Sequence, residues 1–341
     1  PCAVHHDNFD LWDSQHHRWN AVNMGPKKDI TGLWREAALN HGLRFGVTTH
    51  LARSYSWFNV NKGADESGPY QGVPYDGSDP AYRDFYFEPH EDTNRKHPLN
   101  PPESWRREWA MRMKDLIDNY HPDLLYFDGA VPFQGEDQGR TGFEVLAHYY
   151  NHSVQRHDGR QECVMCLKKV EDHGLYIDGI ATLDIERRRA DEILADPWQT
   201  DTSIGPWGYD VRRPYRPVEE LIHELIDIVS KNGNVLLNVP PKADGTLDAE
   251  TEDILARIGG WMDVNGEAIY ETRPWIRSGE GDLRFTRKGD TLYALALTWP
   301  EDGGLRISSL GNSADVGKIE DVTLLGHDGR LVWSQEREGL S

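Results

Sequence analysis

The chain has 341 residues, 57 of them acidic and 37 basic, so its formal net charge at pH 7 is −20. This length suits one large domain with a smaller one beside it. Charged residues interrupt every apolar run well before the roughly 18 residues of a membrane span, and no concentrated basic patch is present, so we expect neither a membrane nor a nucleic acid as partner.

Short apolar runs alternate with longer amphipathic segments from the first residues to about residue 262. This alternation predicts repeated β/α units and a parallel sheet. The expected strands are Cys2–His5, Leu43–Thr49, Leu124–Asp128, Cys163–Leu167, Ile180–Asp184 and Val235–Val239. The expected helices are Asp29–Asn40, Trp105–Tyr120, Phe143–His157, Val218–Lys231 and Ala249–Val264.

Two further segments differ from this pattern. The segment Ala52–Ser104 is rich in Gly, Pro, Asp and Tyr and is far longer than an ordinary connection, so we interpret it as a cover over an active site. After Glu267, Gly-rich turns separate alternating strands such as Thr291–Leu297 and Val322–Leu325. We therefore expect a catalytic domain over residues 1–275 and a small antiparallel β-sandwich over residues 276–341.

Six successive strands could form an open doubly wound sheet or part of a barrel. Polar residues recur where the strands end, which is where barrels gather their catalytic side chains. They are His5, His6, Thr49, His50, Asp128, Asp184 and Asn238. No glycine fingerprint of a dinucleotide-binding sheet follows the first strand. We predict an α/β fold of the (β/α)₈ or TIM-barrel type, and we expect a fragment that lacks the first strands of the barrel.

The clearest chemical signal is Asp128, which ends an apolar strand and precedes Gly129. A turn-forming Asp-Gly is the alternative. The 12 Trp and 14 Tyr residues suit a carbohydrate ligand, since sugar rings stack on aromatic faces. Glycoside cleavage needs two carboxyl groups, and spacing alone leaves the second one open. The candidates are Asp184, Glu186, Asp201 and Glu271.

Metal chemistry is the rival interpretation of a chain with 15 histidines. His5 and His6 are adjacent, and adjacent residues of a strand face opposite ways, so these two rings should not converge on one ion. We see no zinc-binding pair of the H-x-H or H-E-x-x-H type and expect no metal. Cys163 and Cys166 are interpreted as buried thiols.

Five motifs together resemble one known family, the α-L-fucosidases of glycoside hydrolase family 29. They keep the order of the family and spread over most of residues 3–275. The motifs are His5–Ser14, Leu124–Gly129, Asp196–Gly205, Val229–Asn238 and Val264–Tyr270. The resemblance implies a catalytic barrel followed by a β-sandwich. It also implies retaining hydrolysis of terminal α-L-fucosides through a covalent glycosyl-aspartate, without a cofactor, on fucosylated oligosaccharides or glycoconjugates.

The resemblance also implies roles for individual residues. Asp128 matches the nucleophile of the family, and Glu186 lies where some members place their acid/base. His5 and His6 match a pair of sugar-binding histidines, and Tyr126 matches an aromatic position. We expect three further residues in the pocket wall, namely His50, Trp198 and Trp207.

The chain departs from the family at two points. Asn8 stands where members more often have glycine, and the early strand with a His-Trp-Gly motif is absent. Three alternatives stay open: a barrel that acts on another sugar such as an α-L-galactoside, a non-catalytic carbohydrate-binding barrel, and a metal-dependent barrel hydrolase. Secretion or a periplasmic location would suit an enzyme acting on glycans, but the sequence shows no signal peptide, and it leaves the oligomeric state undetermined.

Overall fold

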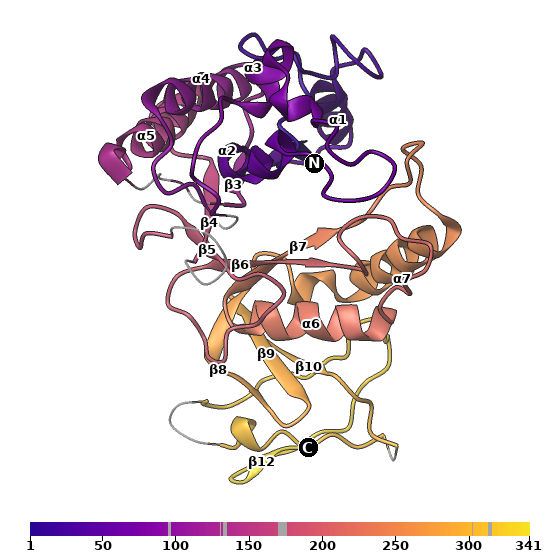
Figure 1. Ribbon diagram of the computed structural model, residues 1–341. Coiled ribbons are helices and arrows are strands. Elements are labelled where there is room, and N and C mark those ends of the chain that lie inside the picture. Colours follow the sequence, from indigo (N-terminus) through magenta and orange to yellow (C-terminus); the bar gives the residue numbers. More distant parts are fainter. Residues whose placement is uncertain (95–96, 130, 132–134, 170–175, 302, 313–315) are drawn as a thin grey trace. The chain divides into compact units, whose positions relative to one another are not determined.

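The computed structural model describes residues 1–94, 97–129, 131, 135–169, 176–301, 303–312 and 316–341 (Figure 1). The chain divides into two compact units, Pro1–Asp184 and Ile185–Ser341. Each unit has a hydrophobic core of its own. Within the part of the chain that the structure describes, no helix combines the length and the apolarity of a membrane span.

The first unit is built on a parallel sheet whose strands follow one another in sequence order. In this sheet Thr49 pairs with Phe127, and Phe127 pairs with Leu167. The residues that follow these three positions therefore lie along one common edge. The strands are β1 (Cys2–Val4), β2 (Gly46–Thr49), β3 (Leu124–Phe127), β4 (Val164–Lys168) and β5 (Thr182–Asp184).

Helices α1 (Ile30–Asn40), α4 (Glu103–Tyr120) and α5 (Arg140–Arg156) connect successive strands of this sheet (Figure 1). Helix α1 begins where the Asp29 side chain accepts a hydrogen bond from the Gly32 N–H, which caps the first turn. Helix α4 buries side chains at helical spacing and ends at His121, whose φ is 48°. Its buried apolar side chains include Trp105, Trp109, Met113, Leu116, Ile117 and Tyr120.

In the described residues of the long segment, 52–94 and 97–104, aromatic side chains pack against one another. The segment contains the short helices α2 (Ser54–Trp57) and α3 (Arg83–Tyr86). The ring centroids of Tyr55 and Phe87 lie 5.8 Å apart, and those of Phe58 and Phe85 lie 5.5 Å apart. These tilted contacts, in which Phe85 is half-buried and the other three rings are buried, stabilise a segment with little regular secondary structure.

The second unit begins with a parallel pair of strands, β6 (Trp198–Ser203) and β7 (Gly233–Asn238). Helix α6 (Val218–Ser230) connects them, and α7 (Ala249–Asn265) follows β7. The Asp248 side chain accepts a hydrogen bond from Thr251 N at 2.8 Å and so caps the first turn of α7.

An antiparallel sheet completes the second unit with strands β8 (Arg273–Glu280), β9 (Leu283–Lys288) and β10 (Thr291–Ala296). Gly281 and Gly289 open its two-residue turns with φ of 52° and 59°, a conformation that suits glycine. The short strands β11 (Gln335–Glu336) and β12 (Gly339–Leu340) pair beyond it.

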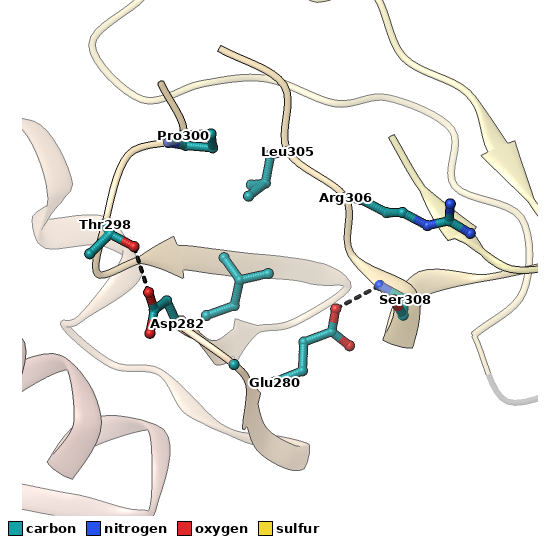
Figure 2. Close-up of a pocket in the computed structure, with 9 residues that line it drawn as sticks. Glu280, Asp282, Thr298, Pro300, Leu305, Arg306 and Ser308 are labelled. Atoms are coloured by element: carbon teal, nitrogen blue, oxygen red, sulfur yellow. Dashed lines mark hydrogen bonds between the residues drawn. The ribbon is translucent and has the colours of Figure 1, made fainter. Parts of the chain in front are cut away.

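A hollow of about 540 Å³ lies in the C-terminal part of the second unit (Figure 2). Its two carboxylates are used to hold the chain. Glu280 accepts a hydrogen bond from Ser308 N at 2.6 Å, and Asp282 accepts one from the Thr298 hydroxyl at 2.6 Å (Figure 2). We therefore assign these acids to the packing of the 298–308 connection rather than to chemistry.

The structure confirms the six strands expected before residue 262, with shifts of a few residues at their ends. It adds β6, whose sequence Trp-Gln-Thr-Asp-Thr-Ser contains no apolar run. It corrects the expectation for Val322–Leu325, where no strand forms although the expected β10 does. Val322 and Leu325 pack against hydrophobic clusters of the second unit while Thr323 and Leu324 are exposed, so the apolar side chains are partly buried here without a strand.

Candidate active site

The carboxyl edge of the first sheet brings together polar residues from consecutive strands. His5 and His6 follow β1, and His50 follows β2. Asp128 follows β3, and Lys168 is the last residue of β4. The backbone continues the ladder at this edge, since His50 N donates to Val4 O at 2.9 Å and Asp128 N donates to Thr49 O at 3.0 Å. The side chains of His50, Asp128 and Lys168 are thus placed by strand register, whereas His5 and His6 lie in the turn that follows β1.

The Asp128 carboxylate lies between two cations. The Lys168 Nζ is 2.9 Å from Oδ1, and the His50 Nδ1 is 2.8 Å from Oδ2. The Lys168 side chain is 1% exposed and that of Asp128 is 18% exposed, so water screens these ion pairs weakly. Burial alone would raise the pKa of Asp128, but the two cations outweigh it and hold that pKa well below the ordinary range.

The charge on His50 follows from the same contact. Burial opposes a charged imidazole, yet the Asp128 carboxylate raises the pKa of His50 to about 9. At neutral pH the centre of the site is therefore a carboxylate anion held by an imidazolium and an ammonium group.

His5 and His6 pack beside His50 and stay neutral. The ring of His5 stacks on that of His50 with centroids 4.2 Å apart, and the rings of His5 and His6 are 4.3 Å apart. Burial lowers the pKa of His5 to about 4 and that of His6 to about 3, and the charged His50 adds to the lowering. A neutral imidazole can donate one hydrogen bond and accept another, which suits sugar hydroxyls.

The convergence of His5 and His6 corrects the expectation that the two rings diverge. Strand β1 ends at Val4, so both histidines lie in the turn that follows, where strand alternation no longer applies. Nitrogen atoms of His5, His6 and His50 lie within 4.8 Å of one another, close enough in principle for a metal ion. The charge of His50 and its contact with Asp128 oppose such binding, because metal ligation needs a neutral imidazole with a free lone pair.

The segment 52–104 reaches this site through Trp57. Its ring lies 4.9 Å from that of His6, and the Trp57 side chain is partly exposed. Trp57 therefore offers an aromatic face beside the histidines, although sequence reasoning did not single it out. The sequence feature that could have identified Trp57 is its position, six residues after Leu51 and within the segment interpreted as a cover.

Lys168 was also missed from the sequence. The expected strand Cys163–Leu167 stopped one residue short of it. Because Leu167 pairs with Phe127, Lys168 stands beside Asp128 in register. Extending the rule of polar strand ends by one residue would have found it.

Tyr126 lies beneath this cluster rather than on its surface. It is 2% exposed, and its hydroxyl donates to Asp184 Oδ1 at 3.2 Å. The Lys168 ammonium lies 5.8 Å from the centre of its ring. Asp184, one of the candidates for a second acid, is fully buried in this contact.

Asn8 and Arg112 support the turn that carries His5 and His6. Asn8 has a φ of 58°, a left-handed conformation that asparagine tolerates better than most residues. Its Oδ1 accepts from Arg112 Nη1 at 2.7 Å, and its Nδ2 donates to Phe85 O at 2.8 Å. Arg112 is 1% exposed and also pairs with Asp10. Asn8 thus joins the histidine turn to α4 and to the segment 52–104.

The other expected site residues belong to the second unit. Glu186 is partly buried and lies between Ile185 and Arg187, whose N–H groups donate to Gln199 O and Asp201 O of β6 at 2.9 Å each. Asp201 is itself buried in β6, and Glu271 pairs with Lys288 at 2.8 Å with its side chain 80% exposed.

The two expected tryptophans of the second unit have different surroundings. Trp198 is 1% exposed at the amino end of β6, and its Nε1 donates to Lys231 O at 2.9 Å, which favours a packing role. Trp207 follows the carboxyl end of β6 and is 41% exposed. The Arg187 guanidinium lies over its ring at 4.1 Å.

Consecutive parallel strands with an ionised carboxylate at their carboxyl edge are the arrangement in which barrel enzymes place their catalytic groups. A family model described as alpha-L-fucosidase matches residues 1–267, and one described as the alpha-L-fucosidase C-terminal domain matches residues 278–341. The chain belongs to the α-L-fucosidase family.

Individual relatives agree with this assignment. The chain is 31% identical to the plasma alpha-L-fucosidase of Homo sapiens over 99% of its own length and 66% of that protein. It is 27% identical to the human tissue alpha-L-fucosidase, covering 97% of the chain and 64% of that protein. The chain thus spans slightly less than two thirds of the length of these relatives.

Solved structures confirm the fold class. The alpha-fucosidase of Thermotoga maritima in complex with fucose is 26% identical, with a TM-score of 0.68 over 100% of this chain and 69% of that one. The alpha-L-fucosidase isoenzyme 1 of Paenibacillus thiaminolyticus is 20% identical with a TM-score of 0.73 over 99% of this chain and 77% of that one, and it supports the fold alone.

Proposed function

We propose that the protein hydrolyses terminal α-L-fucosides of fucosylated oligosaccharides or glycoconjugates. The observation that carries this proposal is the Asp128 carboxylate, which His50 and Lys168 hold ionised at the strand edge. Membership of the α-L-fucosidase family supports the choice of sugar, and so does the relative whose structure contains fucose. We further propose that residues 1–275 form the catalytic barrel and residues 276–341 a separate β-sandwich domain.

In the proposed mechanism Asp128 attacks the anomeric carbon of the fucoside and forms a covalent glycosyl-aspartate with retention over two steps. Lys168 and His50 each contact one oxygen of its carboxylate, and a carboxylate oxygen has a second lone pair left for attack. The same two cations stabilise the carboxylate again when water releases the sugar. They therefore favour the second step, in which Asp128 is the leaving group.

We propose Glu186 as the group that protonates the leaving oxygen in the first step and takes a proton from water in the second. The proposal rests on its place directly after β5 and on the family resemblance. His5 and His6 are proposed to bind sugar hydroxyls as neutral rings, and Trp57 to face the apolar side of the sugar.

The first test is the release of p-nitrophenol from p-nitrophenyl α-L-fucoside by the full chain and by Asp128→Asn. We expect activity to fall by at least about a thousandfold in a variant whose circular dichroism is unchanged. Asp263→Asn, the same substitution at an exposed position on α7, is the matched control and should keep full activity. Hydrolysis of the α-L-galactoside in preference to the fucoside would instead assign the site to the other sugar.

The covalent step has its own test. A 2-deoxy-2-fluoro fucosyl donor should accumulate as an adduct on the peptide that contains Asp128, detectable by mass spectrometry. An adduct on another residue would refute the assignment of the nucleophile. Binding of fucose without turnover or adduct would indicate the non-catalytic barrel.

Glu186 is tested with a pair of substrates. Glu186→Ala should slow an alkyl fucoside much more than the p-nitrophenyl fucoside, because the poorer leaving group depends more on protonation. Glu192→Ala, a nearby exposed glutamate, should slow neither. Equal loss on both substrates would contradict the acid/base role.

A further inference from the structure

A second cluster of imidazole and carboxylate groups lies on two helices of the first unit. Asp118 and His121 come from the end of α4, and His148 and His152 come from α5. Helix α4 is followed directly by β3, and α5 leads into β4, so these helix ends face the amino edge of the sheet. The cluster is therefore at the opposite edge from Asp128.

Position along the chain brings the members of each pair near one another. His148 and His152 are four residues apart within α5, the separation of neighbours on a helix surface, and His121 is the residue that follows α4, three positions after Asp118. Helices α4 and α5 pack side by side (Figure 1). The two faces consequently meet across the helix interface.

Two contacts join these faces. The His121 Nδ1 lies 3.2 Å from the His152 Nε2, and the His148 Nε2 lies 2.6 Å from Asp118 Oδ1. Four groups that ligate metals in proteins are thus arranged as two close pairs. Side chains of His148 and Asp118 are 32% and 48% exposed, so an ion has a path from solvent.

The rings lie near one another, although the ligand atoms of these four groups do not converge within 4.8 Å as those of His5, His6 and His50 do. The centroids of His121 and His152 are 5.0 Å apart, and those of His148 and His152 are 6.3 Å apart. In a tetrahedral zinc site with bonds of about 2.0–2.1 Å to nitrogen, imidazole centroids lie about 5 Å from one another. Binding of one ion by all four groups therefore requires side-chain rotations that break the His121–His152 and His148–Asp118 contacts.

We propose that His121, His148, His152 and Asp118 bind a divalent transition-metal ion of the zinc type, which fastens the end of α4 to α5. Three imidazoles and one carboxylate match the donors that Zn²⁺ accepts, whereas Mg²⁺ and Ca²⁺ need oxygen ligands. Bound at this place, the ion stabilises the fold and takes no part in the chemistry at Asp128.

The test is calorimetric titration of the full chain with Zn²⁺ as the probe. His148→Gln/His152→Gln should bind one ion fewer per chain than the wild type, or bind it at least about a hundredfold more weakly. His41→Gln/His223→Gln is the matched control, with two histidines outside both clusters, and should behave as the wild type does. Any ion held by His5, His6 and His50 is common to all three proteins and cancels in the comparison.

Two further readouts separate coordination from unspecific binding. Co²⁺ in place of Zn²⁺ should give a visible d–d band typical of a four-coordinate site in the wild type, and the band should vanish in His148→Gln/His152→Gln. Zn²⁺ should also raise the Tm of the wild type more than that of this variant. The same number of ions, affinity and band in both proteins would overturn the proposal, and so would a wild type that binds no Zn²⁺ at about 100 μM.

Discussion

Replacing Lys168 by methionine would remove one of the two cations that hold Asp128, with little change in side-chain volume. The lost contact is a 2.9 Å ion pair whose ammonium is 1% exposed. A hydrogen bond to a charged group contributes about 1.5–3 kcal/mol, and Lys168 stabilises the Asp128 carboxylate as it leaves in the second step, so kcat should fall by about 10- to 150-fold. The loss stays below that of Asp128→Asn because His50 still pairs with the carboxylate.

The pH profile gives the sharper readout of this change. In the wild type the pKa of Asp128 lies so far below its ordinary range that its protonation should not limit activity at mildly acidic pH. Without Lys168, burial is opposed by His50 alone, and the pKa of Asp128 must rise. The acid limb of kcat/KM should therefore move to higher pH in Lys168→Met.

Lys169→Met is the matched control, since Lys169 is the next residue and is exposed. Both variants are assayed on p-nitrophenyl α-L-fucoside from mildly acidic to neutral pH, with folding followed by circular dichroism. A folded Lys168→Met whose kcat equals that of the wild type, and whose kcat/KM has the same acid limb, would refute the electrostatic account of Asp128.

Three further predictions follow from contacts around the site. The pKa of His50 is about 9 in the folded state against an ordinary 6.5, so its charge stabilises the fold fully below about pH 6.5 and this contribution is lost as the pH rises through 9. Urea unfolding should therefore show a smaller decline in stability from about pH 6 to 10 in His50→Gln than in the wild type, and parallel curves would contradict this. Asn8→Ala should destabilise the chain by about 1 kcal/mol more than Asn8→Gly, because both variants lose the hydrogen bond to Arg112 but only alanine is strained at a φ of 58°. Equal melting curves for the two variants would argue against a left-handed conformation at Asn8. Trp57→Ala should raise KM several-fold with a smaller effect on kcat if its ring faces the bound sugar, whereas an unchanged KM would remove Trp57 from the site.

Among the parallel strands β1 to β7, the sequence predicted the six that contain apolar runs and missed β6, whose residues are mostly polar. Strand β3 is a continuous apolar run that ends at the acid, so both the strand and Asp128 were visible. Strand β6 is fully buried although its residues are mostly polar. Its Thr200 hydroxyl donates to Ile185 O at 2.7 Å, and such side-chain contacts, which no periodicity reveals, satisfy a polar strand in a core.

Site residues that stand at strand ends could be predicted from the sequence. Contacts between residues of different strands could not. His5, His6, His50 and Asp128 stand at strand ends and were identified for that reason. The pairing of Asp128 with Lys168 depends on the register between β3 and β4, which a single sequence does not contain. The sequence likewise could not show that the hydroxyl of Tyr126 is bonded to Asp184 beneath the cluster.

The two cations around Asp128 have a consequence for a chain that lacks this carboxylate. In Asp128→Gly the pKa of His50 would fall, because burial opposes its charge and the carboxylate that raised this pKa is gone, and the ammonium of Lys168 would face a space with no counter-ion. A buried ammonium without a counter-ion is unfavourable, and a small anion such as formate, azide or chloride from the solvent would supply one. The mutated site would then bind a small anion, and this anion would supply the negative charge that the Asp128 carboxylate supplies in the wild type.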